Sequence, residues 1–294
     1  MMDLPVSRRR PSELAASSRR TPIDLWTVLA YVALTAGLVV VVAPFVWMVF
    51  GSLKNPDELI RLPPTWFPEQ PTLRNYEELV GRLNLPLFFM NSVIVAGAVT
   101  VGNLIFCSML GFALAKLRFP GRDLLFTLVI ATLLIPGSVT LIPSFILISS
   151  LGLVNTYPGL FLPFVAGAFG VFLMRQFMLG IPNELIDVAR VDGASDYRIF
   201  WQVVLPLSGP ALATLGILTF LGSWNGFLWP LVVAQSEKLY TLPVALATFS
   251  RGQHAADYGL LMAGSFVIVV PILVVFVALQ RFITRGIAMT GIKG

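Results

Sequence analysis

The sequence predicts an all-α membrane protein with six transmembrane helices. Hydrophobic residues make up 56% of the 294 residues, and only 12% are charged. The mean hydropathy of +0.84 is far above that of a soluble domain of this length. The apolar runs are continuous rather than alternating, which favours helices over a transmembrane barrel. Because the gaps between runs are short, we expect one membrane domain and no separate soluble domain.

The number of spans follows from the thickness of the bilayer. A hydrocarbon core of about 30 Å requires roughly 20 apolar residues per helix. By this measure six runs qualify as spans: residues 26–51, 89–115, 124–149, 159–178, 209–233 and 259–280. Prolines inside these runs predict kinks, because proline removes a backbone hydrogen bond: Pro44, Pro136, Pro143, Pro163 and Pro271. The membrane domain then covers residues 26–284, with tails at 1–25 and 285–294.

The distribution of basic residues predicts that both termini lie in the cytoplasm. Lys and Arg concentrate before the first run, at 116–122, at 175–198 and after the last run. Along the chain these four regions alternate with the remaining connections between runs, so all four lie on one side of the membrane. The positive-inside rule makes that side cytoplasmic. A cleaved signal peptide is the alternative for the start of the chain, but the first apolar run is too long for a signal core. We therefore expect a multi-pass protein of the cell membrane.

Residues able to carry chemistry are scarce. The central parts of the runs contain no Asp, Glu, Lys, Arg or His, so a proton relay is not expected. Cys107 lies alone in the second run, and the only histidine, His254, lies in the last external segment. The stretch from Gly286 to Gly291 resembles a phosphate loop but lacks the Lys and hydroxyl residue that must follow. We expect no catalytic site, metal or cofactor in this chain, and the pI near 9.7 gives no reason to propose nucleic acid.

The polar connection over residues 182–208 is patterned as two short helices joined by a bend. Asn183 and Glu184 suit a helix start, and helical spacing continues to Val191. Glycine at 193 permits a break, and Ser195 predicts an N-cap for a second helix that ends at Pro206. This architecture favours a docking site for another protein. The alternative is a helix that lies on the membrane surface without a partner.

The spacing in this connection resembles the EAA signature of ATP-binding-cassette importer permeases, in particular the sugar-importing, maltose-type branch. Asp187-Val188-Ala189 is followed after three residues by Gly193 and after nine more by Val203-Val204-Leu205-Pro206. Asp187 stands where the signature usually has Glu, and Val188 where it usually has Ala. Further family-like features run along the chain: Ser52-Leu53-Lys54, Asn75-Tyr76, Asn91-Ser92, Trp224-Asn225 and Gly291-Ile292-Lys293-Gly294.

The resemblance implies a type I importer fold with spans two to six as the core and a peripheral first span. It also implies a second homologous permease chain and two ATPase subunits, or a homodimer of one, which bind ATP and Mg²⁺. An extracytoplasmic solute-binding protein would deliver the substrate. The loop would be the coupling helix in a cleft of the ATPase, and these residues would take part: Glu184, Asp187, Ala189, Asp192, Gly193, Ala194, Leu205 and Pro206.

In maltose-type systems the C-terminal tail reaches between the ATPase subunits, which would involve Thr290, Gly291 and Lys293 here. A frayed chain end is the alternative reading of this tail. For the substrate, uncharged spans fit a neutral sugar held by hydrogen bonds and aromatic faces. Candidate contacts are Asn91, Asn103, Trp224 and Asn225, each of which could instead hold helices together. The remaining alternatives are a permease for sn-glycerol 3-phosphate or another small solute, and a non-transporting membrane assembly protein.

Overall fold

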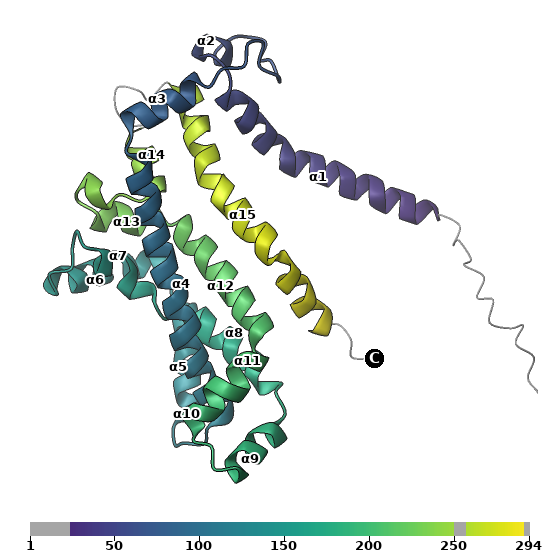
Figure 1. Ribbon diagram of the computed structural model, residues 1–294, viewed down its shortest axis with the longest axis vertical. Coiled ribbons are helices and arrows are strands. Elements are labelled where there is room, and N and C mark those ends of the chain that lie inside the picture. The colour runs from purple at the N-terminus through teal and green to yellow at the C-terminus, as the bar shows by residue number, and fades with distance from the viewer. Residues whose placement is uncertain (1–23, 250–256, 291–294) are drawn as a thin grey trace, which may run out of the picture. The chain divides into compact units, whose positions relative to one another are not determined.

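The computed structural model describes residues 24–249 and 257–290, with side chains placed as far as Ala278 in the second range. All regular structure in these ranges is helical, as the composition predicts (Figure 1). The chain divides into two units, Met1–Trp47 and Met48–Gly294. The first unit contributes most of α1 (Leu25–Ser52), an apolar helix whose hydrophobic window is unburied, as expected of a helix surrounded by lipid.

Three helices are long and apolar enough to cross a bilayer unaided: α1, α4 (Leu85–Lys116) and the part of α15 (Tyr258–Thr290) that extends to Ala278. Three bent helix pairs meet the same test, so the described residues supply up to six spans. The second and sixth predicted spans lie within α4 and α15. The third, fourth and fifth differ from the predicted continuous helices.

The third predicted span, 124–149, is broken in the middle. It consists of α5 (Arg122–Leu133) and α6 (Gly137–Ser150), which meet at 104°. Pro136 lies at the break with ψ of 135°, and it precedes the first residue of α6. Because proline has no N–H to donate to the preceding turn, the chain at this point ends one helix and begins another, rather than kinking a single one.

The fourth predicted span, 159–178, is also divided. It comprises α7 (Tyr157–Phe161), the 3₁₀ turn η2 (Leu162–Phe164) and α8 (Ala168–Leu179), with a bend of 44°. The fifth predicted span, 209–233, ends early, since α12 (Gly209–Trp224) stops before Gly226 and α13 (Leu228–Val233) is a separate helix. Glycine at 226 is a poor helix former, so the apolar composition after it does not extend the helix.

The core of the second unit is built around α4, which packs against α8 and α12, while α12 also packs against α15. Two glycines allow the close approach of α4 to its neighbour. A Cβ atom on Gly111 would lie 2.7 Å from the Cβ of Met174, and one on Gly102 would lie 2.7 Å from the Cβ of Val165. Small residues at such positions are a common device in membrane proteins, because they let helix backbones touch.

Short elements lie at one end of α4. They include α2 (Pro56–Leu59), α3 (Arg74–Arg82), η4 (Glu237–Leu239) and α14 (Leu242–Phe249). Here Lys54 is 1% exposed, and its Nζ lies 3.7 Å from Oε1 of Glu58. Asn75 donates to the carbonyl oxygens of Ser52 and Lys54, both at 2.8 Å. Two of the family-like motifs, around residues 52–54 and 75–76, are therefore joined in one buried polar cluster.

Candidate functional site

The loop over 182–208 folds as two helical arms at the end of α4 opposite α2 and α3 (Figure 1). The first arm is α9 (Asn183–Val191), which occupies the residues expected from the sequence. The second arm consists of α10 (Asp196–Ile199), the π-helical turn η3 (Phe200–Val204) and α11 (Leu205–Leu207). It continues through Pro206 instead of ending there. The π turn ends at Val204, two residues before Pro206, which suits a residue that cannot donate a backbone hydrogen bond.

The bend between the two arms depends on Gly193 and Ser195. Gly193 has φ of +80°, a conformation that favours glycine, and a Cβ there would meet nothing within 4 Å. Ser195 caps the second arm, since its Oγ accepts from the backbone N–H of Arg198 at 3.3 Å. Arg190, which the sequence did not single out, joins the arms by donating to Oδ1 of Asp196 at 2.9 Å.

One face of the arms packs onto the spans. Ile186 is 3% exposed and Ile199 and Val204 are fully buried. They belong to a core cluster with residues of α4 and α8, among them Phe112 and Met174. Ala189 and Ala194 are partly buried and pack against this cluster. Both arms are therefore fixed to the membrane helices by apolar contacts, the second arm by more of them.

The opposite face is open and apolar. Val188 is 61% exposed, Tyr197 66% and Val191 89%, although all three are large hydrophobic residues. The predicted acidic residues Glu184, Asp187 and Asp192 are exposed alongside them. Leu205 is half-buried at the end of the second arm, and Pro206 beside it is exposed. Exposed large apolar residues close in sequence to exposed charged ones are typical of a protein docking surface.

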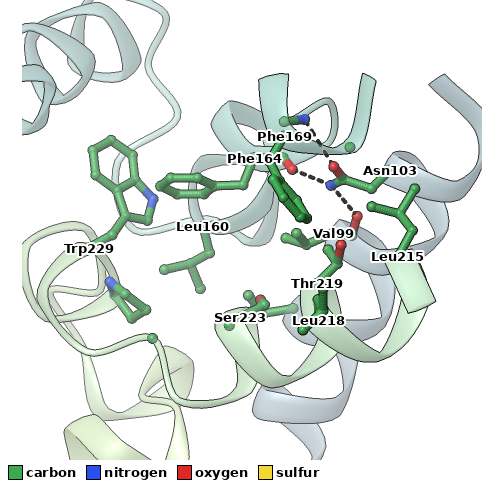
Figure 2. Close-up of a pocket in the computed structure, with 16 residues that line it drawn as sticks. Val99, Asn103, Leu160, Phe164, Phe169, Leu215, Leu218, Thr219, Ser223 and Trp229 are labelled. Carbon is green, nitrogen blue, oxygen red and sulfur yellow. Dashed lines mark hydrogen bonds between the residues drawn. The ribbon is translucent and has the colours of Figure 1, made fainter. Parts of the chain in front are cut away.

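A second candidate site is a cavity of about 340 Å³. It lies where α4, η2, α8, α12 and α13 meet (Figure 2). The rings of Phe164 and Trp229 form one side, in an edge-to-face pair with centroids 5.6 Å apart. The other side carries Thr219 and Ser223 of α12. The lining residues, all in the described part of the chain, include no charged side chain.

Thr219 and Ser223 differ from the other hydroxyl groups on α4 and α12. Thr100, Ser108 and Thr214 each donate to the carbonyl oxygen four residues earlier. Within the described ranges, the side-chain hydroxyls of Thr219 and Ser223 make no hydrogen bond, although both side chains are half-buried and line the cavity. Their hydroxyls are therefore available to a ligand. Sequence reasoning missed them because unpaired hydroxyls cannot be recognised from spacing.

Asn103 lines the cavity, but its amide is fully used by the protein. Its Nδ2 donates to the carbonyl oxygens of Val99 at 2.8 Å and Phe164 at 2.6 Å, and its Oδ1 accepts from the backbone N–H of Gly167 at 2.9 Å. The bonds to Phe164 and from Gly167, drawn in Figure 2, satisfy backbone groups that the break between η2 and α8 leaves without helical partners. Asn103 thus holds this broken span against α4.

The other predicted contact residues lie outside the cavity lining. Asn91 is fully buried and donates to the carbonyl oxygens of Lys238 and Tyr240, both at 2.9 Å. Trp224 is 1% exposed and donates from Nε1 to the carbonyl oxygen of Ile268 at 3.1 Å. In this conformation both join elements of the protein, which is the helix-packing alternative. Asn225 is exposed, and its Nδ2 bonds only to the Leu221 carbonyl of its own helix among the described residues.

The predicted tail residues fall at the edge of the described chain. Thr290 is the last residue of α15, and Gly291 and Lys293 lie outside the described residues. Within the described residues, no group of three or more His, Cys, Asp or Glu side chains is placed to hold a metal ion.

Bent spans, an uncharged cavity among them and an exposed apolar face on a polar loop are features of a polytopic membrane protein. Residues 108–289 match the family described as binding-protein-dependent transport system inner membrane component. The chain belongs to this family. It is the permease subunit of a binding-protein-dependent importer in the inner membrane, and in this family the permease is the non-catalytic membrane component.

Several curated relatives match over nearly the whole chain. An arabinooligosaccharides transport system permease of Halalkalibacterium halodurans is 39% identical, with 94% of this chain and 99% of that protein covered. A diacetylchitobiose uptake system permease of Streptomyces coelicolor is 33% identical, covering 93% and 90%. An sn-glycerol-3-phosphate transport system permease of Brucella abortus is 32% identical, covering 89% and 96%.

The fold also has a solved counterpart. A bacterial ABC transporter that imports the acidic polysaccharide alginate matches with a TM-score of 0.78 at 23% identity, covering 88% of this chain and 96% of that one. A second structure of an alginate transporter, in complex with a pentasaccharide-bound periplasmic protein, matches with a TM-score of 0.62 at 16% identity. These likenesses establish the all-helical fold of an ABC importer permease.

Proposed function

We propose that this chain forms half of the translocation pathway of an ATP-driven importer for an oligosaccharide. Residues 26–284 form the permease domain, and both termini lie in the cytoplasm. The second half of the pathway comes from a homologous permease chain, and an extracytoplasmic binding protein delivers the sugar. Two ATPase subunits carry ATP and Mg²⁺, and this chain binds no cofactor of its own. The arabinooligosaccharide and diacetylchitobiose permeases among its relatives support a sugar as the substrate.

The uncharged cavity is the observation that best supports a neutral sugar as the substrate. It offers two hydroxyl groups, on Thr219 and Ser223, that have no partner among the described residues, opposite the aromatic side chains of Phe164 and Trp229. A sugar presents hydroxyl groups at its edge and C–H groups on its faces, and it carries no charge. Hydroxyls on one wall and aromatic rings on the other match that chemistry. Asn103 holds the wall in place, and Asn225 lies exposed just beyond it.

The loop over 182–208 supplies the link to ATP hydrolysis. We assign the open face of α9 and α10 to the ATPase, with Gly193 setting the angle between the arms. Apolar residues on the other face fix the second arm to the core that contains α4 and α8. Nucleotide binding can then shift the equilibrium between inward- and outward-facing states, provided that the ATPase binds the two states with different affinity.

A phosphorylated solute is the second candidate, because one group of relatives transports sn-glycerol 3-phosphate at a similar level of identity. A phosphate group would favour Lys or Arg in the pathway. The described residues that line the cavity provide neither, so the counter-charge would have to come from the second permease. The cavity of this chain therefore favours the neutral sugar.

Isolation of the intact complex from native membranes tests both the class and the substrate. A second permease, an ATPase and a solute-binding protein should co-purify with this chain. The binding protein is then titrated calorimetrically with arabino-, chito- and malto-oligosaccharides and with sn-glycerol 3-phosphate. We expect one oligosaccharide series to bind. Binding of sn-glycerol 3-phosphate alone would replace the sugar proposal by its alternative, and the absence of an ATPase would indicate a non-transporting assembly protein.

A further inference from the structure

We propose that Lys116 is a positioning residue that ties the first arm of the docking loop, α9, to the paired helices α4 and α8. Through this tie, displacement of α9 by the ATPase would move the helices that line the cavity. The inference rests on the proposed docking of the ATPase at α9. It concerns a residue outside the loop and outside the EAA-like motif.

The helices α4 and α8 are locked to each other by close contacts. Gly111 of α4 touches the backbone of α8, since a Cβ there would lie 3.0 Å from the backbone nitrogen of Arg175. From the other side, a Cβ on Gly170 of α8 would lie 2.8 Å from Sγ of Cys107. Interiors packed this closely transmit displacement, because neither helix can shift without the other. The two helices therefore act as one rigid pair.

Two basic side chains form hydrogen bonds between the ends of α4 and α8. Nζ of Lys116, the last residue of α4, donates to the carbonyl oxygen of Ile181 at 2.6 Å, just after the end of α8. In return, Nε of Arg175 in α8 donates to the carbonyl oxygen of Leu114 near the end of α4 at 3.3 Å. The last carbonyl groups of a helix lack helical partners and attract positive charge. Arg175 thus caps the end of α4, and Lys116 binds the backbone two residues after the end of α8.

Lys116 also reaches α9 itself. Its Nζ donates to Oδ1 of Asn183, the first residue of α9, at 2.8 Å, and Glu184 adds an attractive charge. Pro182, which precedes the helix, makes no side-chain cap. The start of α9 is therefore held by a charge-assisted hydrogen bond from α4. Since Val95, Val99 and Asn103 of α4 line the cavity, the tie connects α9 to the cavity through a single helix.

The test compares Lys116→Met with Lys116→Arg and, as a matched control, with Arg118→Met, which removes the exposed cation two residues further on. All are made in the intact complex with its partner subunits. Assembly is followed by co-purification of the ATPase. Docking is followed by cross-linking between a cysteine placed at the exposed Val191 and the ATPase. Coupling is measured in proteoliposomes as sugar transported per ATP hydrolysed.

We expect the cross-link to persist and the sugar transported per ATP to fall about tenfold in Lys116→Met, the size expected when hydrogen bonds to a charged group are lost. Lys116→Arg should recover most of this ratio, and Arg118→Met should leave it unchanged. Equal ratios in Lys116→Met and Arg118→Met would overturn the proposal. If the Val191 cysteine gave no cross-link in the otherwise unchanged complex, the docking assignment would itself be wrong and the inference would fall with it.

If Lys116→Met does not assemble, Asn183→Ala decides the question. It removes one acceptor of Lys116 and leaves the bond to the Ile181 carbonyl in place. A reduced transport ratio with normal assembly supports the tie, and an unchanged ratio overturns it.

Discussion

Gly193 sets the angle between the two arms of the docking loop through its backbone conformation. Its φ of +80° is unfavourable for a residue with a Cβ, by roughly 1–2 kcal/mol and more for a β-branched one. A Cβ at this position would meet nothing within 4 Å in this chain, so the cost arises from the backbone conformation. The amino acid here is therefore dictated by the bend itself.

Replacing Gly193 with valine should abolish sugar uptake while membrane insertion stays normal, because the second arm remains anchored by its own apolar residues. Gly193→Asn should retain much of the uptake, since asparagine tolerates positive φ. Asp187→Ala should do little harm: its carboxylate is 69% exposed and lies 4.0 Å from Arg190, a pair worth less than about 1 kcal/mol. Wild-type uptake by a stably assembled Gly193→Val complex would refute the docking role of the bend.

The free hydroxyls of the cavity give a second prediction. Each hydrogen bond from Thr219 or Ser223 to a sugar would contribute about 0.5–1.5 kcal/mol, so the double change Thr219→Val with Ser223→Ala should raise the apparent KM for uptake roughly tenfold. Thr214→Val is the matched control on the same helix, because the Thr214 hydroxyl is already bonded to the Pro210 carbonyl. An unchanged KM in the double variant would show that Thr219 and Ser223 do not contact the substrate.

At the scale of helices, the close contact between α4 and α8 allows a test of the packing. Gly111→Ala should destabilise the protein by about 1–3 kcal/mol, because the added methyl group would lie 2.7 Å from Met174 Cβ and must force the helices apart. Gly97→Ala is the control on the same helix, where a Cβ meets nothing within 4 Å. Thermal unfolding of the detergent-solubilised complex measures both. Equal midpoints would show that the backbones do not touch at Gly111.

The sequence predicts the helices better than it predicts their breaks. The bounds of the first arm can be predicted because an Asn-Glu pair marks its N-terminus and a glycine follows its C-terminus. Pro136 signals a kink, but a kink and a 104° break remove the same hydrogen bond, so the pattern cannot distinguish them. The cavity is hidden for a similar reason: Thr214 and Thr219 look alike in sequence, and only the fold shows which hydroxyl has a partner.

For the whole molecule, the C-terminal tail is a candidate second contact with the ATPase. We expect deletion of residues 290–294 to lower ATPase activity stimulated by the loaded binding protein, while assembly through the docking loop persists. Residues 290–294 include two glycines and the basic residue Lys293, and small residues suit insertion between two subunits. Stimulation and uptake equal to those of the full chain would show that the tail is a frayed end.

We propose that this chain, with its partners, drives an oligosaccharide through the membrane at the expense of ATP. The most direct measurement reconstitutes the purified complex in proteoliposomes, with ATP inside and the loaded binding protein outside. Labelled oligosaccharide, in the series that the binding protein recognises, should accumulate only when ATP and binding protein are both present, and Gly193→Val should abolish this uptake. Accumulation without ATP, or none when both are present with the unaltered complex, would contradict the account.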